Sequence, residues 1–285
     1  MSKLKIAIQK QGRLNEGSLQ LLKSCGISIS NGNDQLKVSV ANFPIEILYL
    51  RNSDIPQYIE DGVADIGIIG ENLLFEKQGK VELVERLGFS KCKVCLAVPK
   101  DVVEDSVTYF EGKKIATSYP KTLQHYLAQN GVNAEIHTIS GSVEIAPNIG
   151  LADGICDIVS SGSTLFKNGL RKTQTILSSE AVLVKSPKLS DEKEAVLDKL
   201  LFRLRAVLRA RNSKYILLNV PNEKIEQVAE ILPVMKSPTI LPLAQEGWSS
   251  LHSVIDESTF WEVIDELKAA GAEDILIVPI DKMVR

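Results

Sequence analysis

The residues best suited to chemistry lie in one stretch of the chain, residues 150–170. An apolar run at 155–159 leads into a loop of hydroxyl side chains and one glycine, namely Ser160, Ser161, Gly162, Ser163 and Thr164. Hydroxyls and the free N–H groups of a helix N-terminus bind phosphate, and glycine lets the backbone approach the ligand. Because open α/β sheets bind ligands at the carboxyl ends of their strands, this hydroxyl-rich loop (160–164) predicts a phosphate site.

Two carboxylates, Asp153 and Asp157, precede the hydroxyl-rich loop. Carboxylates beside a phosphate site are suited to facing ribose hydroxyls or to sharing Mg²⁺ with the phosphate. The alternative is an ordinary turn from strand to helix with common capping residues. Hydroxyl, glycine and carboxylate features coincide here, and that coincidence favours the phosphate site.

The elements that must position this loop alternate between β-rich and helical runs, which is typical of an α/β fold. In a first lobe, strands are predicted at 5–9, 36–40, 45–51 and 65–69, and helices at 15–25 and 53–62. In a second lobe, strands are predicted at 92–98, 114–116, 134–138 and 155–159, and helices at 121–130 and 143–151. A strand at 181–185 returns to the first lobe, and a long helix follows at 191–211.

The segment after residue 212 has a different charge and a regular order of elements. It carries 6 Lys and Arg against 12 Asp and Glu, which leaves 27 against 24 in the other 212 residues. Strands are predicted at 215–220, 239–243, 251–255 and 274–278, and helices at 222–232 and 258–270. This β-α-β-β-α-β order is that of a ferredoxin-like module, and an acidic module of this kind suits a ligand-sensing role. The mildly basic remainder suits an anionic small ligand.

Composition excludes several classes of protein. With 285 residues, 44 % apolar and 24 % charged, the chain fits two or three globular domains. A net charge of −3 argues against a nucleic-acid partner, and the absence of a long apolar run argues against a membrane span. The start of the chain resembles a strand rather than a signal peptide, so we expect a cytoplasmic protein.

The four cysteines fit a reducing compartment. Cys92 and Cys95 have the spacing of a redox pair, but they lie on a predicted strand, where the two side chains point to opposite faces. The three histidines have no ligand-like spacing. We therefore expect no metal held by the protein alone.

Six segments in the same order resemble the ATP phosphoribosyltransferase family, the first enzymes of histidine biosynthesis. One of them is the hydroxyl-rich loop with Gly-Ser-Val-Glu (141–144) upstream of it. The others are Gln-Lys-Gln-Gly-Arg-Leu (9–14), Arg-Asn-Ser-Asp-Ile-Pro (51–56), Asp-Ile-Gly-Ile-Ile-Gly-Glu-Asn (65–72), Ala-Thr-Ser-Tyr-Pro (116–120) and Ser-Pro-Thr-Ile-Leu-Pro-Leu-Ala (237–244). The resemblance covers the whole chain and includes the C-terminal module that distinguishes the long, hexameric form.

The resemblance implies transfer of phosphoribose from phosphoribosyl pyrophosphate to N1 of ATP, with Mg²⁺ as cofactor and L-histidine as feedback inhibitor. It also implies a homo-oligomer, from dimer to hexamer, and two catalytic lobes similar to type II periplasmic binding proteins with the active site in the cleft. Lobe I would comprise residues 1–90 with 180–212, lobe II residues 91–179, and the regulatory domain residues 213–285.

The same resemblance assigns the site residues. Those implied to bind ATP are Lys10, Arg13, Arg51, Glu71 and Tyr119. Those implied to bind phosphoribosyl pyrophosphate are Asp157, Ser160, Ser161, Gly162, Ser163, Thr164 and Leu165. The catalytic set is Asp153, Asp157 and Glu144, with Mg²⁺ carried on the substrate and contacted by the two aspartates.

Histidine would contact Asn219, Thr239, Met235 and Asp274, where Asn219 replaces an aspartate of relatives. The ATP-binding and catalytic assignments have structural alternatives. The cations could be ordinary exposed surface residues, Glu71 a carboxylate at a helix N-terminus, Tyr119 a turn aromatic and Glu144 a helix cap.

Two rival functions remain at this point. A solute-binding protein would share the two-lobed architecture, but it would need an export signal. A regulatory subunit without activity would sense an amino acid, but it would have no need of an intact phosphate loop. Pyrophosphate release that requires ATP would separate both from the transferase.

Overall fold

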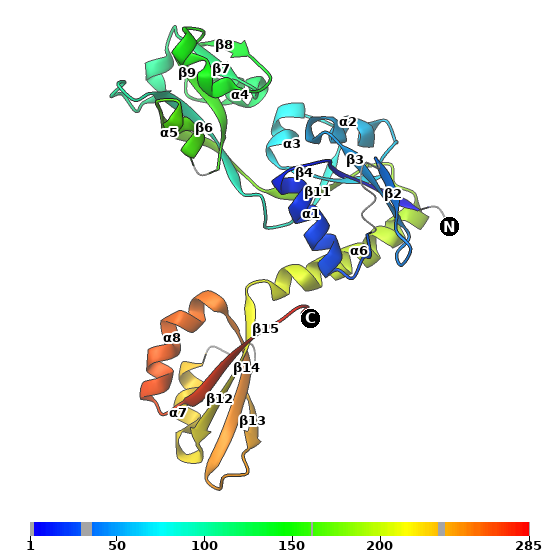
Figure 1. Cartoon of the computed structure of the whole chain (residues 1–285), viewed down its shortest axis with the longest axis vertical. Coiled ribbons are helices and arrows are strands. Elements are labelled where there is room, and N and C mark those ends of the chain that lie inside the picture. The colour runs from blue at the N-terminus through cyan, green and yellow to red at the C-terminus, as the bar shows by residue number, and fades with distance from the viewer. Residues whose placement is uncertain (1–2, 30–35, 161, 233–236, 285) are drawn as a thin grey trace. The chain divides into compact units, whose positions relative to one another are not determined.

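The computed structural model describes residues 3–29, 36–160, 162–232 and 237–284. By its internal contacts the chain divides into two units, Met1–Leu197 and Asp198–Arg285 (Figure 1). The first unit contains two mixed sheets with helices, and the second contains one antiparallel sheet with helices. The predicted α/β fold class is confirmed. In the described part of the chain, no helix is long and apolar enough to cross a membrane.

Lobe I of the first unit is built on a six-stranded sheet in the order β2-β3-β1-β4-β11-β5. Its strands are β1 (Leu4–Gln9), β2 (Lys37–Ser39), β3 (Ile45–Leu50), β4 (Ile66–Gly70), β5 (Glu82–Arg86) and β11 (Ala181–Lys185). Its helices are α1 (Arg13–Ser24), the single turn η1 (Asn52–Asp54), α2 (Ile55–Glu60) and α3 (Asn72–Lys77). Because β1 runs parallel to β3 and β4, the carboxyl ends of these three strands lie at one edge of the sheet.

Lobe II has a five-stranded sheet in the order β10-β6-β9-β7-β8. Its strands are β6 (Cys92–Pro99), β7 (Lys114–Thr117), β8 (Glu135–Thr138), β9 (Gly154–Val159) and β10 (Leu170–Ser179). Its helices are η2 (Val107–Phe110), α4 (Pro120–Gln129), η3 (Val143–Ile145), η4 (Pro147–Ile149) and α5 (Ser163–Lys167). Phe110 is fully buried among the apolar side chains of β6, β7 and α4.

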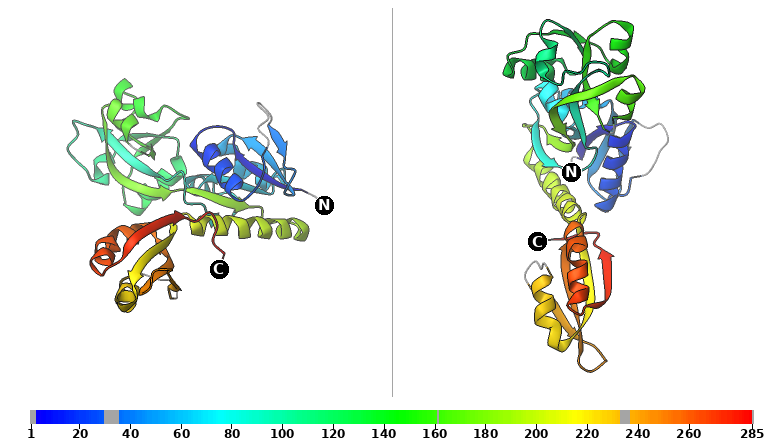
Figure 2. Two further views of the ribbon diagram at one scale, coloured as in Figure 1. Left: turned by 60° about the horizontal axis from the view of Figure 1, so that its bottom comes forward. Right: turned by 90° about the vertical axis from the view of Figure 1, so that its left-hand side faces the viewer.

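The two lobes are joined by two neighbouring segments, residues 87–91 between β5 and β6 and Glu180 between β10 and β11. The first segment hydrogen-bonds to the start of β11, next to Glu180. The N–H of Leu87 donates to the carbonyl of Ala181, and the N–H of Ala181 donates to that of Phe89, both at 2.9 Å. The crossing can be followed in both views of Figure 2. Strand β11 therefore joins the sheet of lobe I, as its sequence predicts.

Three features of the first unit differ from the sequence predictions. The helix predicted at 143–151 is two separate 3-10 turns, η3 and η4, because Pro147 has no N–H to continue a helical ladder. Strand β5 and the long strand β10 were not predicted. In both strands the polar side chains outnumber the apolar ones, so their sequences show no clear hydrophobic period. Helix α3 was not predicted either.

The second unit contains β12 (Ser213–Pro221), η5 (Asn222–Lys224), α7 (Ile225–Ile231), β13 (Thr239–Pro242), β14 (Trp248–Asp256), α8 (Glu257–Ala269) and β15 (Glu273–Pro279). The strands lie in the order β13-β14-β12-β15 and all neighbours are antiparallel, which is the predicted ferredoxin-like arrangement. Its core packs residues such as Ile216, Leu251 and Phe260 between the sheet and the two helices.

Helix α6 (Asp191–Ala210) connects the units, and the division between them falls inside it, at Leu197 and Asp198. Its first turns belong to lobe I, where Lys193 Nζ donates to buried Asp65 Oδ1 at 2.7 Å. The domain boundary at residue 213 stays a prediction.

Candidate functional site

The hydroxyl-rich loop follows β9 and begins α5. Gly162 has a φ of 76° and stands at the N-cap of α5, a left-handed conformation that favours glycine. Leu165 is only 7 % exposed and packs among apolar residues that include Ile155 and Ala116. The side chains of Ser160, Ser163 and Thr164 are exposed, and Ser161 lies outside the described residues. A buried leucine thus anchors a loop that presents the hydroxyls of Ser160, Ser163 and Thr164 to solvent.

Asp157 lies on β9 just before this loop and is half-buried. Burial raises the pKa of Asp157 from its ordinary value of 3.8 to about 6, with the nearby charge of Glu144 acting in the same direction. The N–H of Ile158 donates to Asp157 Oδ1 at 2.7 Å and opposes that rise. Burial, followed by the charge of Asp157, likewise raises the pKa of Tyr119. Two residues expected in the site, Glu144 and Tyr119, therefore each lie near Asp157.

Asp153 lies apart from Asp157, at the other end of β9. Its Oδ2 accepts a hydrogen bond from the N–H of Lys114 at 2.8 Å, at the amino end of β9. On a strand, residues four apart share a face but lie about 13 Å from each other. The expectation that Asp153 and Asp157 form one acidic pair facing the ligand is therefore wrong, and Asp153 joins the starts of β7 and β9 instead.

Three cations lie at the carboxyl edge of the lobe I sheet. Lys10 and Arg51 directly follow β1 and β3, which pair in parallel, and the N–H of Lys10 donates to the carbonyl of Leu50 at 2.8 Å. Arg13 begins α1 after Gly12, whose φ is 89°. All three side chains are exposed. This cationic edge (Lys10, Arg13 and Arg51) is suited to polyphosphate.

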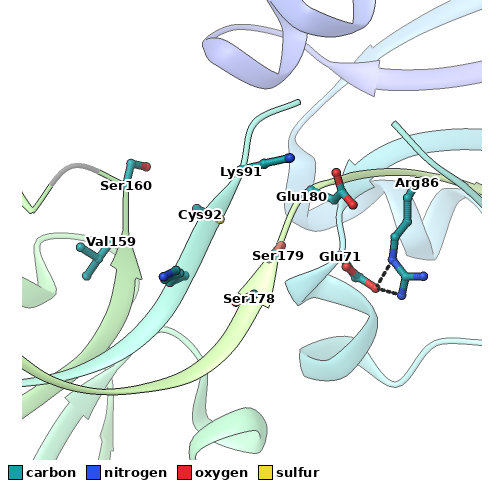
Figure 3. Close-up of a pocket in the computed structure, with 10 residues that line it drawn as sticks. Glu71, Arg86, Lys91, Cys92, Val159, Ser160, Ser178, Ser179 and Glu180 are labelled. Carbon is teal, nitrogen blue, oxygen red and sulfur yellow. Dashed lines mark hydrogen bonds and ion pairs between the residues drawn. The ribbon is translucent and has the colours of Figure 1, made fainter. Parts of the chain in front are cut away.

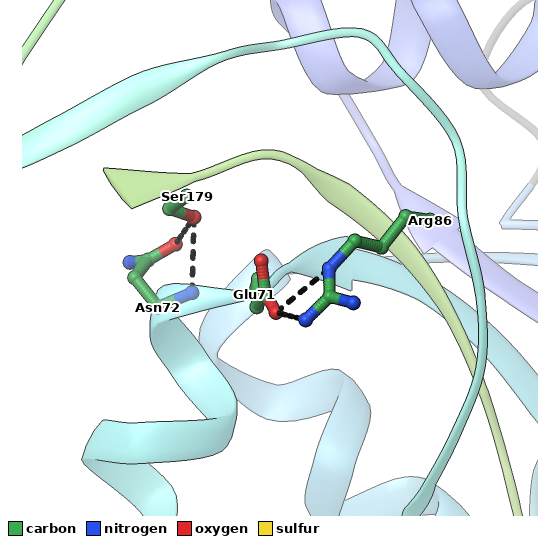
Figure 4. A network of polar contacts seen from close by, with 4 residues as sticks. All are labelled: Glu71, Asn72, Arg86 and Ser179. Atoms are coloured by element: carbon green, nitrogen blue, oxygen red, sulfur yellow. Dashed lines mark hydrogen bonds and ion pairs between the residues drawn. The ribbon is translucent and has the colours of Figure 1, made fainter. Parts of the chain in front are cut away.

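Glu71 follows β4 and is 8 % exposed. Its Oε1 accepts two hydrogen bonds from Arg86, at 2.5 Å from Nη2 and 3.2 Å from Nε (Figure 4). Sequence reasoning missed Arg86 because it ends β5, a strand that was not predicted. The carboxylate of Glu71 is therefore engaged by a neighbouring guanidinium, which limits its role as a free acceptor for a nucleoside.

A pocket of about 570 Å³ lies where the connecting segments cross between the lobes (Figure 3). It contains three cations, two carboxylates, one thiol, three serine hydroxyls and one apolar side chain. Its lining residues are Glu71, Arg86, Lys91, Cys92, Lys93, Val159, Ser160, Ser178, Ser179 and Glu180.

Only Glu71 and Ser160 of the predicted site residues line this pocket. The pair of lysines on either side of Cys92 is the sequence signal that could have identified it. We infer that anionic groups are favoured here, because Arg86, Lys91 and Lys93 are exposed.

In the second unit, two of the predicted effector residues are in contact. Asn219 Nδ2 donates to Asp274 Oδ2 at 3.1 Å. Thr239 pairs with His252 across β13 and β14, and Asn219 pairs with Ser250, so all four side chains lie on the sheet face opposite the helices. Met235 lies outside the described residues.

A polar network that was not predicted occupies the same face of the sheet. The hydroxyl of Tyr215 lies 3.0 Å from Nδ1 of His252, and Nε2 of that ring lies 3.1 Å from the hydroxyl of Ser250. These side chains border Thr239 and Asn219 in the register of the sheet. A ligand at the predicted effector residues would therefore lie beside an imidazole ring.

Two family models match the chain. The model described as ATP phosphoribosyltransferase matches residues 51–206, and the one described as HisG, C-terminal domain, matches residues 210–282. An ATP phosphoribosyltransferase of Cytophaga hutchinsonii is 56 % identical over 282 residues, and one of Bacteroides thetaiotaomicron is 54 % identical over 281 residues. Each alignment covers 99 % of both chains.

A solved structure agrees with these matches. The ATP phosphoribosyl transferase (HisG:HisZ) complex from Thermotoga maritima is 31 % identical with a TM-score of 0.63, covering 72 % of this chain and 98 % of that chain. The family predicted from the six sequence segments is confirmed, and a solute-binding protein is excluded. The chain therefore belongs to the ATP phosphoribosyltransferase family, the first enzymes of histidine biosynthesis, and has the long form of its architecture.

Proposed function

We propose that the hydroxyl-rich loop holds phosphoribosyl pyrophosphate and that the cationic edge of lobe I holds ATP. The observation that carries the first assignment is the left-handed Gly162 at the carboxyl end of β9, with exposed hydroxyls around it and Leu165 packed beneath it. Backbone N–H groups and hydroxyls at such a turn match the oxygens of a phosphate. The exposure of Lys10, Arg13 and Arg51 at neighbouring strand ends supports the second.

The reaction needs no nucleophilic side chain. The lone pair of adenine N1 forms the new bond to the anomeric carbon of the ribose, and the bond from that carbon to pyrophosphate breaks with its electrons leaving on the pyrophosphate. Positive charge develops on the ribose ring as the bond breaks. The carboxylate of Asp157, with Glu144 nearby, is suited to stabilising that charge.

The remaining contribution of the protein is alignment. Holding two bound reactants in attack geometry raises the rate of their reaction by many orders of magnitude. Tyr119, beside Asp157, is suited to contacting the adenine ring.

The donor set around the loop is suited to Mg²⁺ carried by the substrate. Among the described residues, no group of three or more His, Cys, Asp or Glu side chains is arranged to hold a metal. Asp157 is a half-buried carboxylate whose charged form is disfavoured by burial, so a neighbouring cation would stabilise it. Mg²⁺ carried by the substrate would neutralise pyrophosphate charge, and Asp157 is the residue we assign to contact it. Asp153 has no part in this assignment.

The second unit is proposed to bind L-histidine as a feedback inhibitor. Its net negative charge favours a cationic amino group, and Asn219, Asp274 and Thr239 offer an amide, a carboxylate and a hydroxyl on one sheet face. We also propose that the chain works as a homo-oligomer, between dimer and hexamer, in the cytoplasm. Coupling of the two sites by the usual 1–3 kcal/mol would weaken substrate binding roughly 5–150-fold.

The test of the substrate assignment is pyrophosphate release measured with each substrate omitted in turn. We expect release only when ATP, phosphoribosyl pyrophosphate and Mg²⁺ are all present. Arg51→Ala is expected to weaken ATP binding in calorimetry and to leave phosphoribosyl pyrophosphate binding within about twofold, because its guanidinium lies at the lobe I edge. Equal weakening of both substrates would contradict the assignment of ATP to that edge.

A further inference from the structure

A buried carboxylate links the two lobes away from the pocket at their crossing. Glu76 lies on α3 of lobe I and is 8 % exposed. Its Oε1 accepts a hydrogen bond from the N–H of Lys121 at 3.2 Å, and its Oε2 accepts from the N–H and the hydroxyl of Thr122, each at 3.0 Å. All three donors belong to lobe II, at the start of α4.

Helix α4 needs this partner. Tyr119 stands at its N-cap and offers no side-chain hydrogen bond, and Pro120 occupies the first turn. The first N–H groups of a helix have no partner within the helix, and the helix dipole favours negative charge there. The cap of a ten-residue helix in lobe II is thus supplied by a side chain of lobe I, 45 or more residues earlier in the sequence.

A short series of hydrogen bonds leads from this cap to the proposed site of phosphoribosyl pyrophosphate. The N–H of Tyr119 donates to the hydroxyl of Thr117 at 2.9 Å, and that hydroxyl donates to the carbonyl of Cys156 at 2.7 Å. Thr117 is fully buried, and Cys156 directly precedes Asp157 on β9. The orientation of α4 is therefore tied to the strand that carries the hydroxyl-rich loop.

We propose that Glu76 is a positioning residue that sets the placement of lobe II against lobe I, so that ATP on one lobe lies at attack distance from phosphoribosyl pyrophosphate on the other. The proposal rests on the assignment of one substrate to each lobe. Glu76 touches neither substrate and acts through α4. Because the phosphates of ATP are assigned to lobe I and phosphoribosyl pyrophosphate to lobe II, with Tyr119 the one ATP residue on lobe II, loss of this contact should affect the reaction of the bound pair more than the binding of either partner.

The experiment compares Glu76→Gln and Glu76→Ala in the full chain. The glutamine keeps one acceptor oxygen in place of two, and the alanine keeps none. We expect kcat to fall about tenfold to a hundredfold in Glu76→Ala and by less in Glu76→Gln, since small misplacements of bound reactants have effects of that size. The dissociation constant of each substrate alone, measured by calorimetry, should stay within about twofold.

Glu60→Gln is the matched control. Glu60 Oε1 accepts a hydrogen bond from the N–H of Lys80 at 2.8 Å, but both residues belong to lobe I. This variant makes the same chemical change as Glu76→Gln, but at a contact within one lobe, so its kcat should match that of the unaltered chain. Thr122→Val, which removes one hydroxyl donor, should lower kcat modestly and should have little further effect in Glu76→Ala.

The outcomes separate the two proposals. If Arg51→Ala and Thr164→Ala each weaken one substrate but the Glu76 variants keep their kcat within twofold, the positioning role is wrong and the substrate assignment stands. Loss of affinity for one substrate without loss of kcat would also overturn it, because that result marks a local structural role. If Arg51→Ala and Thr164→Ala do not separate the substrates, the assignment itself fails. Should Glu76→Ala not fold, Glu76→Gln and Thr122→Val supply the same kinetic comparison.

Discussion

Replacing Asp157 by asparagine should make the protein without substrates more stable at pH 8 while removing most of its transferase activity. Burial disfavours the charged form of this carboxylate and raises its pKa from 3.8 to about 6. Asparagine has the same shape, carries no charge and keeps an oxygen that accepts the hydrogen bond from the N–H of Ile158. The substitution therefore removes a buried charge and leaves the local geometry in place.

The size of the effect follows from the difference between the folded and unfolded pKa values. That difference is roughly two pH units, and each corresponds to about 1.4 kcal/mol, so ionised Asp157 lowers the free energy of unfolding by about 3 kcal/mol at pH 8. The folded protein binds this proton more tightly than the unfolded chain does. The destabilisation is therefore nearly absent below about pH 3, grows as the pH rises toward 6, and is complete above that value. At pH 4.5 it amounts to about 1 kcal/mol.

The assay is urea unfolding of both proteins at pH 4.5 and pH 8, followed by circular dichroism, with pyrophosphate release measured in parallel. Both tryptophans, Trp248 and Trp261, lie in the second unit, so their fluorescence follows that unit and should not change. Asp101→Asn, at an exposed carboxylate, is a matched control that should change stability by less than about 0.5 kcal/mol at either pH. A gain in Asp157→Asn that is equal at the two pH values, or no gain at pH 8, would refute the argument from burial.

Three further substitutions test other parts of the molecule. Thr164→Ala should weaken phosphoribosyl pyrophosphate binding about tenfold to a hundredfold in calorimetry, since one hydrogen bond to a charged group is worth about 1.5–3 kcal/mol. Gly162→Val should lose more, because valine is strained at a φ of 76° and its side chain would occupy the phosphate approach; wild-type affinity in both variants would contradict the loop assignment. Arg86→Ala should lower the melting temperature slightly by leaving buried Glu71 without its ion-pair partner; an unchanged melting temperature would show that the pair adds nothing. Thr239→Ala should weaken inhibition in a histidine titration of activity, and inhibition that persists unaltered would place the effector elsewhere.

Several local features of this chain could be predicted from its sequence alone. Short apolar runs predicted β1, β4, β9 and β11, because a strand that is covered on both faces of its sheet carries apolar side chains along most of its length. A glycine among hydroxyls after an apolar strand predicted a turn of the backbone, and Gly162 makes that turn with a φ of 76°. The β-α-β-β-α-β order of the second unit was likewise readable, because each element is short and bounded by its own turn residues.

The side-chain partners were decided by tertiary structure. The ion pair of Glu71 with Arg86 depends on β5 entering the sheet beside β11, and polar strands such as β5 and β10 carry no period that a sequence pattern could detect. The separation of Asp153 from Asp157 follows from strand spacing, which places residues close in sequence at opposite ends of an element. Glu76 could not be assigned from sequence, because its partners Lys121 and Thr122 reach it only when two lobes fold against each other. Hydrogen bonds between residues far apart in the chain leave no periodic trace in sequence, so only the folded chain determines which buried carboxylate meets which donor.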